Sequence, residues 1–189
     1  AFELTNGRIT DSVLRDNAGT GIWLSNNGMA ERLAAFGHLG GANAYAVQLT
    51  GNANVDDSLV YGNTVGVLIS GGGAVRDSRI FENVTGIDSR SSGLIVGSRI
   101  HSNQTGVIGN YSFPTSPAVR LVNNIVYDNT NVAVQGRNGI GYDLINNTVY
   151  QGVGSAVDLT GTVSSARLRN NILWSDIGAV LGVSAGSQD

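Results

Sequence analysis

The sequence predicts an all-β fold in which about eight short coils stack into a solenoid. A phrase at residues 76–87, RDSRIFENVTGI, returns twenty residues later at residues 96–107 as VGSRIHSNQTGV. Related phrases recur along the whole chain at intervals of 20–26 residues. Each interval holds three apolar segments that are too short for helices and rich in β-branched residues. Such a unit cannot bury its apolar face alone, so it must stack on its neighbours.

One polar position marks each repeat. We place it at Asn17, Asn43, Asn63, Asn83, Asn103, Asn129, Gly152 and Asp176, with steps of 26, 20, 20, 20, 26, 23 and 24 residues. At a sharp bend Asn tolerates the left-handed backbone conformation, and its amide both donates and accepts hydrogen bonds. We therefore expect an asparagine ladder that satisfies the backbone groups of successive bends.

Three apolar columns are expected to point into the solenoid, because side chains alternate along a strand. The first strand contributes Ile9, Ala35, Val55, Val75, Ile95, Leu121, Leu144 and Leu168. The second contributes Leu14, Val60, Ile80, Ile100, Val126, Val149 and Leu173, with Gly40 departing from the pattern. The third contributes Ile22, Val47, Val67, Ile87, Val107, Val134, Val157 and Val180, each preceded by a Gly or Ala that fits a tight corner. A small polar residue begins each second strand at Ser12, Ser58, Ser78, Ser98, Asn124, Asn147 and Asn171, with His38 departing.

Two stretches interrupt this regularity. The segment from Met29 to Leu39 has helical periodicity, so a short helix and a distorted coil both remain open there. The connection at residues 110–118, NYSFPTSPA, is long and holds both prolines. No linker divides residues 1–189, so we expect a single β-helix domain. Neither end shows a cap, which favours a fragment or module of a larger protein.

The phrases NNIVYDN, NNTVYQG and DSRIFEN resemble the repeat of right-handed parallel β-helix proteins of the pectin-lyase-like superfamily. The resemblance covers nearly the whole chain and implies a single-stranded right-handed parallel β-helix of about eight coils, each with three short strands. The superfamily includes polysaccharide lyases, hydrolases and epimerases as well as many surface proteins. The repeat itself is structural, so the resemblance implies the fold and leaves the activity open.

Composition excludes several classes of function. A net charge of −3 argues against nucleic-acid binding, because phosphate contacts need a dense basic surface. The chain has no Cys and no Lys, which excludes disulfides, thiolate metal sites, Cys nucleophiles and Schiff-base lysines. No stretch approaches about 18 uninterrupted apolar residues, so no membrane span is predicted.

The outward positions of the first strand hold the best candidates for catalysis, since the resemblance places catalysis of the lyases and hydrolases on that face. They are Asp56 and Arg76, together with Asp57 and Asp77, which directly follow them in the chain. Asp57 and Asp77 occupy equivalent positions on adjacent coils, about 5 Å apart. Two carboxylates that close bind a cation such as Ca²⁺, share a proton, or pair with Arg. The alternative is a solvated corner column shared with Asn123, Asn146 and Asn170, which needs no cofactor.

His38 is a further catalytic candidate. The stretch GHLGG at residues 37–41 resembles the Gly-His-Gly of polygalacturonases. The order of the acids and the histidine differs from that family, and its other motifs are absent. The alternative is a polar corner residue.

Two outward rows could bind a ligand or partner. Tyr61, Phe81, His101, Tyr127, Tyr150 and Trp174 form an aromatic column that could bind sugar rings or simply stack. Val96, Val122 and Ile145 form an aliphatic row that residues 110–118 could cover and that could otherwise mediate self-association, as could the open ends of the solenoid.

We therefore expect a non-enzymatic module of an extracellular, cell-surface or periplasmic protein, acting as a spacer and as a rod that binds carbohydrate or a protein partner. The alternative is a polysaccharide lyase, hydrolase or epimerase that acts on an anionic polysaccharide. The absence of a complete catalytic motif favours the module.

Overall fold

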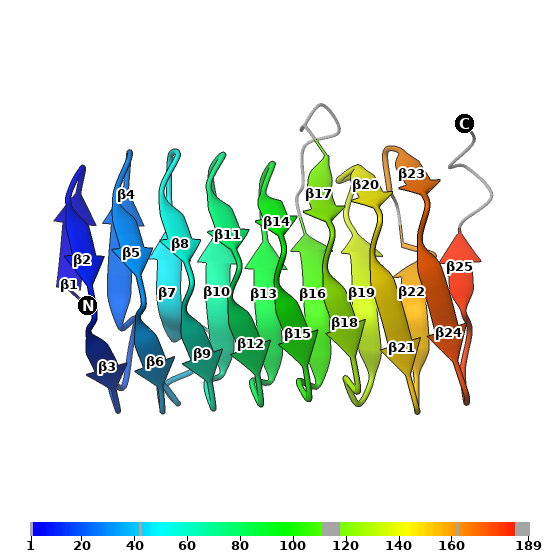
Figure 1. The fold of residues 1–189 in the computed structure, drawn as a ribbon, viewed down its shortest axis with the longest axis horizontal. Helices are drawn as coiled ribbons and strands as arrows, with labels where there is room; N and C mark the ends of the chain where they lie inside the picture. Colours follow the sequence, from blue (N-terminus) through cyan, green and yellow to red (C-terminus); the bar gives the residue numbers. More distant parts are fainter. Residues whose placement is uncertain (1, 42, 111–117, 162, 184–189) are drawn as a thin grey trace.

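The chain forms a rod of stacked coils. A computed structural model describes residues 2–41, 43–110, 118–161 and 163–183. These residues contain strands and no helix, and β1 and β25 lie at opposite ends of the rod (Figure 1). No helix in the described ranges could therefore cross a membrane. The predicted all-β parallel β-helix is confirmed.

Three parallel sheets run along the rod, each built from one strand per coil. Sheet A has nine strands: β1 (Phe2–Thr5), β4 (Ile22–Ser25), β7 (Tyr45–Leu49), β10 (Val65–Ile69), β13 (Thr85–Ser89), β16 (Thr105–Asn110), β19 (Val132–Arg137), β22 (Ser155–Leu159) and β25 (Leu181–Val183). Sheet B has eight: β2 (Arg8–Thr10), β5 (Met29–Glu31), β8 (Asn54–Asp56), β11 (Ala74–Arg76), β14 (Leu94–Val96), β17 (Val119–Val122), β20 (Tyr142–Ile145) and β23 (Ala166–Arg169). Sheet C has eight: β3 (Val13–Arg15), β6 (Ala34–Phe36), β9 (Leu59–Tyr61), β12 (Arg79–Phe81), β15 (Arg99–His101), β18 (Ile125–Tyr127), β21 (Thr148–Gln151) and β24 (Ile172–Ser175).

The core is a stack of aliphatic side chains that follows the three predicted columns. In the fourth coil, for example, Val75, Ile80 and Ile87 come from the three sheets and are fully buried. Each pairs with the equivalent residue of the next coil, as Ile80 does with Ile100. The repeat therefore encodes both the strand register and the core.

The predicted asparagine ladder lies at the corner between sheets C and A. The Oδ1 atom of Asn83 accepts hydrogen bonds from the backbone N of Asn63 at 3.0 Å and from its Nδ2 at 2.9 Å. The Nδ2 atom of Asn83 donates to the carbonyls of Phe81 and Val60. The same pattern continues through Asn103 and Asn129. A second ladder joins sheets B and C through Ser58, Ser78, Ser98, Asn124, Asn147 and Asn171.

The left-handed conformation lies one residue earlier than expected. The ladder asparagines are not among the residues with positive φ, whereas Glu82 and Ser102, which directly precede Asn83 and Asn103, both have φ of 55°. The ladder side chain must point back into the corner to reach the neighbouring coil, so the residue before it makes the turn. The prediction that the ladder Asn itself is left-handed is wrong.

The second coil differs from the predicted register. Ala35 pairs with Leu14 and Val60 in sheet C, and Ala30 takes the inward place in sheet B. His38, and not Asn43, therefore stands at the ladder position, where its backbone N donates to Asn63 Oδ1 at 3.0 Å. The extra residues of this coil follow the ladder position. Met29–Leu39 forms two strands and their turns, so the helical alternative is wrong.

The ladder position after Asn129 is also filled differently. The sequence pattern assigns Gly152 to it, but the side chain of Gln151 occupies the bend. Its Oε1 atom accepts a hydrogen bond from the backbone N of Asn129 at 2.8 Å, and Gln151 is fully buried. The longer side chain of Gln reaches the bend from one position earlier in the chain.

Tyr142 is an aromatic insertion in an otherwise aliphatic core. Its side chain is 1% exposed, and its hydroxyl donates to the carbonyl of Gln135 at 2.6 Å. Gly109 and Gly136 make the room for it, because a Cβ atom at Gly109 would overlap the hydroxyl and one at Gly136 would lie 3.0 Å from the ring. Burial raises the pKa of the Tyr142 hydroxyl, which stays protonated as a donor.

Candidate functional site

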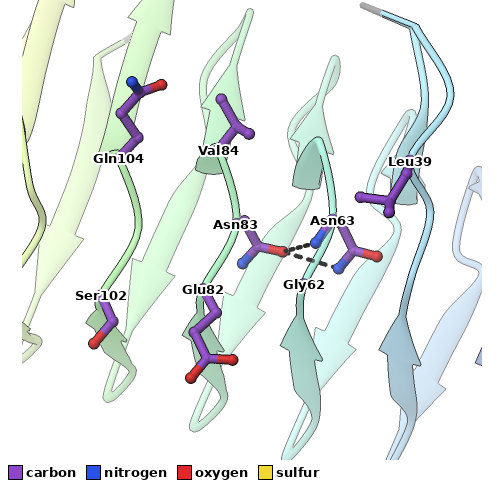
Figure 2. Close-up of a pocket in the computed structure, with 8 residues that line it drawn as sticks. All are labelled: Leu39, Gly62, Asn63, Glu82, Asn83, Val84, Ser102 and Gln104. Atoms are coloured by element: carbon purple, nitrogen blue, oxygen red, sulfur yellow. Dashed lines mark hydrogen bonds between the residues drawn. The ribbon is translucent and has the colours of Figure 1, made fainter.

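A shallow groove of about 540 Å³ runs along the corner between sheets C and A. The buried ladder residues Asn63 and Asn83 form its floor (Figure 2). Figure 2 shows Val84 and Gln104 on one side of this floor. The remaining lining residues are Leu39, Gly62, Glu82 and Ser102. Because the groove crosses successive coils, it follows the long axis of the rod.

Two smaller hollows lie at the same corner. The one toward β1 has a volume of about 280 Å³ and shares Leu39 with the groove. The one toward β25, of about 320 Å³, is lined by residues around Asn129 and Val153. We call the groove and these two hollows the corner groove. Leu39, Val84 and Val153 are 73%, 51% and 58% exposed, so the corner groove offers apolar contacts beside polar ones.

The outer face of sheet C carries stacked aromatic rings, as the predicted column implied. The rings of Phe36, Tyr61, Phe81, His101 and Tyr127 follow one another with centroids 4.7–5.2 Å apart and planes within 5–16° of parallel. We call these five residues the aromatic stripe. Phe36 belongs to it because it pairs in register with Tyr61 on sheet C.

Stacking limits what the aromatic stripe can bind. Each inner ring has both faces against its neighbours, so only ring edges are available to a ligand. Burial, and next the charge of Arg79, lower the pKa of the His101 imidazole, which keeps this ring neutral within the stack. Tyr150 and Trp174 were predicted in the same column, and both instead form hydrogen bonds to Asp176. The aromatic stripe therefore has mainly a structural role, which agrees with the predicted role of simple stacking.

Two arginines, Arg79 and Arg99, lie beside the aromatic stripe, and we call them the arginine pair. Seven of the eleven arginines form ion pairs within the described residues, whereas Arg79 and Arg99 form none there. The two pair in register on adjacent strands, and both are exposed. Arg79 lies 5.6 Å from the centroid of the Phe81 ring. Like charges that face each other across strands are unfavourable, so this position suits an anionic ligand.

The predicted catalytic carboxylates lie on and beside sheet B. Asp56 forms an ion pair with Arg76 at 3.3 Å, and Arg76 also donates to Asn54. Asp57 and Asp77 sit at the next corner with φ of 45° and 49°, and both are exposed. Asn123, Asn146 and Asn170 share this left-handed conformation, which supports the corner-column interpretation. No group of three or more potential metal ligands occurs in the described part of the chain.

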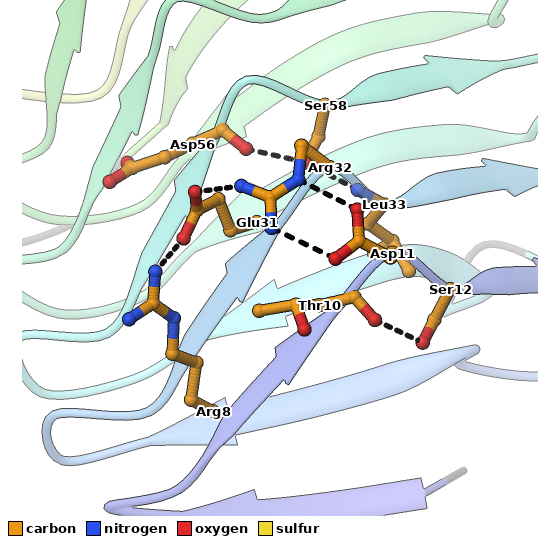
Figure 3. Close-up of polar contacts among 9 residues, drawn as sticks. All are labelled: Arg8, Thr10, Asp11, Ser12, Glu31, Arg32, Leu33, Asp56 and Ser58. Carbon is orange, nitrogen blue, oxygen red and sulfur yellow. Dashed lines mark hydrogen bonds and ion pairs between the residues drawn. The ribbon is translucent and has the colours of Figure 1, made fainter.

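The N-terminal part of sheet B holds a larger ion-pair network (Figure 3). Glu31 bridges Arg8 and Arg32, and Arg32 makes two hydrogen bonds to the carboxylate of Asp11. Hydrogen bonding to Arg32 lowers the pKa of Asp11. These charges neutralise one another within the network.

The aliphatic row of sheet B is present as predicted. Val96, Val122 and Ile145 occupy equivalent outward positions of β14, β17 and β20 and are half-buried. The segment expected to cover them, residues 110–118, lies mostly outside the described residues. Self-association through this row stays a prediction.

Sequence reasoning missed a charged cluster on the outer face of sheet A. Asp88 is 7% exposed and accepts a hydrogen bond from Arg90, whose guanidinium lies 5.6 Å from the centroid of the Tyr45 ring. Burial raises the pKa of the Asp88 carboxyl, and Arg90 partly opposes it. Asp88 pairs in register with Leu68 and Ile108. A charge between two apolar residues at equivalent positions of the neighbouring repeats was the signal available in the sequence.

His38 is buried at the N-terminal end of the asparagine ladder. It is 0% exposed, and neither ring nitrogen has a hydrogen-bond partner of ordinary geometry among the described residues. Burial lowers the pKa of the imidazole, while the Leu14 carbonyl and Asp16 oppose this shift. A ring closed off from solvent favours a corner residue over a catalytic one.

Replacing His38 by Asn should reduce the acid sensitivity of the fold. Because the folded-state pKa is lowered, the stability contributed by neutral His38 is full above the unfolded pKa of about 6.5 and is lost as pH falls through the folded value. His38→Asn removes this proton uptake. Urea unfolding at about pH 7.5 and about pH 5 should show a smaller loss for the variant than for the wild type. An equal loss would contradict the assignment.

Comparison with known proteins identifies the fold. The periplasmic alginate epimerase AlgG superposes with a TM-score of 0.58 at 15% sequence identity, over 96% of this chain and 46% of AlgG. The A-module of the Azotobacter vinelandii mannuronan C-5 epimerase AlgE4 aligns over 96% of this chain and 87% of its own, with a TM-score of 0.36 and 10% identity. The chain spans about half the length of AlgG. No protein-family model and no curated protein sequence matches the chain.

Proposed function

We propose that this chain is a non-enzymatic β-helix module. It binds an extended polysaccharide along the corner groove and also acts as a spacer. The observation that carries the proposal is the direction of the groove, which crosses coil after coil along the rod. An extended polymer fits such a trough, whereas a small substrate would be held in a deeper and more enclosed pocket.

The chemistry of the groove supports a sugar ligand. Ser102 and Gln104 offer hydroxyl and amide groups, and Leu39 and Val84 offer apolar contacts. Sugars present hydroxyls and apolar C–H faces together, so they use both kinds of contact. The proposal also places the module outside the cytoplasm, at the cell surface or in the periplasm, where such polymers occur. The fold neighbour AlgG is described as periplasmic.

A panel of immobilised polysaccharides tests the proposal. The wild type should bind at least one extended glycan without releasing products, and Val84→Trp should lower the affinity about tenfold by filling the groove. Glu3→Trp, on an exposed position of sheet A, is the matched control and should bind as the wild type does. Release of shorter or unsaturated products, or a change in sugar configuration, would select the alternative, a polysaccharide lyase, hydrolase or epimerase. Binding to no glycan in the panel would overturn the proposal.

The arginine pair should make binding depend on ligand charge. Replacing both Arg79 and Arg99 by Ala should weaken binding of anionic glycans about tenfold or more, because each charge-assisted hydrogen bond contributes about 1.5 kcal/mol or more. Added salt should weaken the wild-type interaction in the same direction. Arg167→Ala on sheet B provides a control that also removes a positive charge. A double variant that binds as tightly as the wild type would show that the pair has no such role.

A further inference from the structure

The aromatic column of sheet C changes character after Tyr127. Up to that ring each side chain stacks face to face on its neighbour, and the ring faces are occupied. Tyr150 lies in register between Tyr127 and Trp174, yet it forms no such stack within the described residues. Because β21 has a paired strand on each side, the exposure of Tyr150 does not depend on the end of the rod. Tyr150 is 40% exposed and Trp174 is 59% exposed.

Asp176 accounts for this change. Its Oδ2 atom accepts a hydrogen bond from the Tyr150 hydroxyl at 2.8 Å, and its Oδ1 atom accepts one from Trp174 Nε1 at 2.6 Å. The carboxylate thus holds both rings by their polar ends and draws them away from stacking. These hydrogen bonds lower the pKa of Asp176, so the carboxylate is ionised at neutral pH. Two exposed aromatic side chains are therefore fixed in place before any ligand arrives.

Such a cluster has the parts that bind a sugar ring. An uncovered aromatic face packs against the apolar C–H face of a pyranose, and the fixed geometry reduces the entropy lost on binding. Each oxygen of Asp176 keeps a lone pair beyond the hydrogen bond that it already accepts, so it can also accept from a sugar hydroxyl. The inner rings of the aromatic stripe cannot provide this contact, because their faces are covered.

We propose that Tyr150, Trp174 and Asp176 form a site for one pyranose residue of the bound glycan, while the aromatic stripe has no direct part in sugar binding. This inference rests on the proposed function and identifies the residues that bind one sugar ring of the glycan. It divides the predicted aromatic column into a structural part and a binding part.

Affinity for the best glycan of the panel tests the site. Trp174→Ala and Tyr150→Ala should each weaken binding about tenfold, and Asp176→Asn should weaken it by a smaller factor because the amide no longer fixes both rings. Phe81→Leu, which removes a ring from the aromatic stripe, should bind within about twofold of the wild type. Unfolding curves of the four variants confirm that each is folded.

The outcomes separate this site from the proposed function. If the wild type binds a glycan and the Trp174, Tyr150 and Asp176 variants bind equally well, the site is refuted and the module remains. If Phe81→Leu weakens binding as much as Trp174→Ala while staying folded, the division of the column is refuted. If the wild type binds no glycan at all, the proposed function and this site are overturned together.

Discussion

Asn103→Ala should destabilise the rod by about 3–4 kcal/mol, since several buried polar groups would lose their partners at once. The Asn103 side chain accepts from the backbone N and the Nδ2 of Asn83. It also donates to the carbonyls of Ile80 and His101 and to Asn129 Oδ1. Alanine fills none of these roles, and the Asn103 site is 0% exposed. Urea unfolding followed by circular dichroism measures the loss.

The neighbouring residue provides a control. Gln104 lies on the outer side of the same corner and lines the groove, so Gln104→Ala should change the free energy of unfolding by about 0.5 kcal/mol or less. Asn103→Asp tests the mechanism more finely, because a carboxylate keeps the acceptor and loses the donors. A loss below about 1 kcal/mol for Asn103→Ala would mean that the ladder is dispensable.

Gly109→Ala should cost about 3 kcal/mol because its new methyl group overlaps the buried hydroxyl of Tyr142. The Tyr142 hydroxyl is fixed by its hydrogen bond to the carbonyl of Gln135, so it cannot move away without losing this bond. Thermal and urea unfolding of the single variant measure the penalty.

A double-mutant cycle shows whether this contact is the cause. Tyr142→Phe removes the atom that overlaps most, so the Gly109→Ala change should cost about 1–2 kcal/mol less in a chain that already carries Tyr142→Phe than in the wild type. Gly152→Ala is the matched control, because a Cβ there meets only the Tyr150 hydroxyl at 3.9 Å. Strict additivity of the Gly109 and Tyr142 variants would locate the penalty elsewhere, for example in the backbone of β16.

The inward columns were predictable because every coil must bury one apolar side chain from each of its three strands. This requirement recurs in the sequence with a period of about twenty residues. Ile80 and Ile100 had to share a column once the two phrases were aligned, and they pair in register. The register predicted for the second coil was wrong because a His takes the place of a ladder Asn and an Asn occurs five residues later in the connection. Sequence similarity alone cannot tell a polar ring at a bend from a polar side chain in a loop. The strand pairing of Ala35 decides it.

The candidate site was less predictable than the fold. The sequence pattern places the aromatic side chains in one column, but it does not determine the angle of their rings, which decides whether a face is free. Tyr150 and Trp174 donate hydrogen bonds to Asp176, a residue assigned only to the ladder position in the sequence. Asp88 was missed for a related reason, since its burial arises from neighbouring coils that lie about twenty residues away on either side.

The two tryptophans lie near opposite ends of the rod, so their fluorescence can report on the unfolding of each end. Trp23 donates to the Thr50 hydroxyl near one end, and Trp174 lies on the last strand of sheet C at the other. Each coil of a solenoid is supported chiefly by its neighbours, so unfolding can start at one end and travel. Fluorescence of Trp23→Phe and Trp174→Phe variants would therefore follow the opposite ends separately. The difference between the two traces would reveal the direction in which the coils come apart.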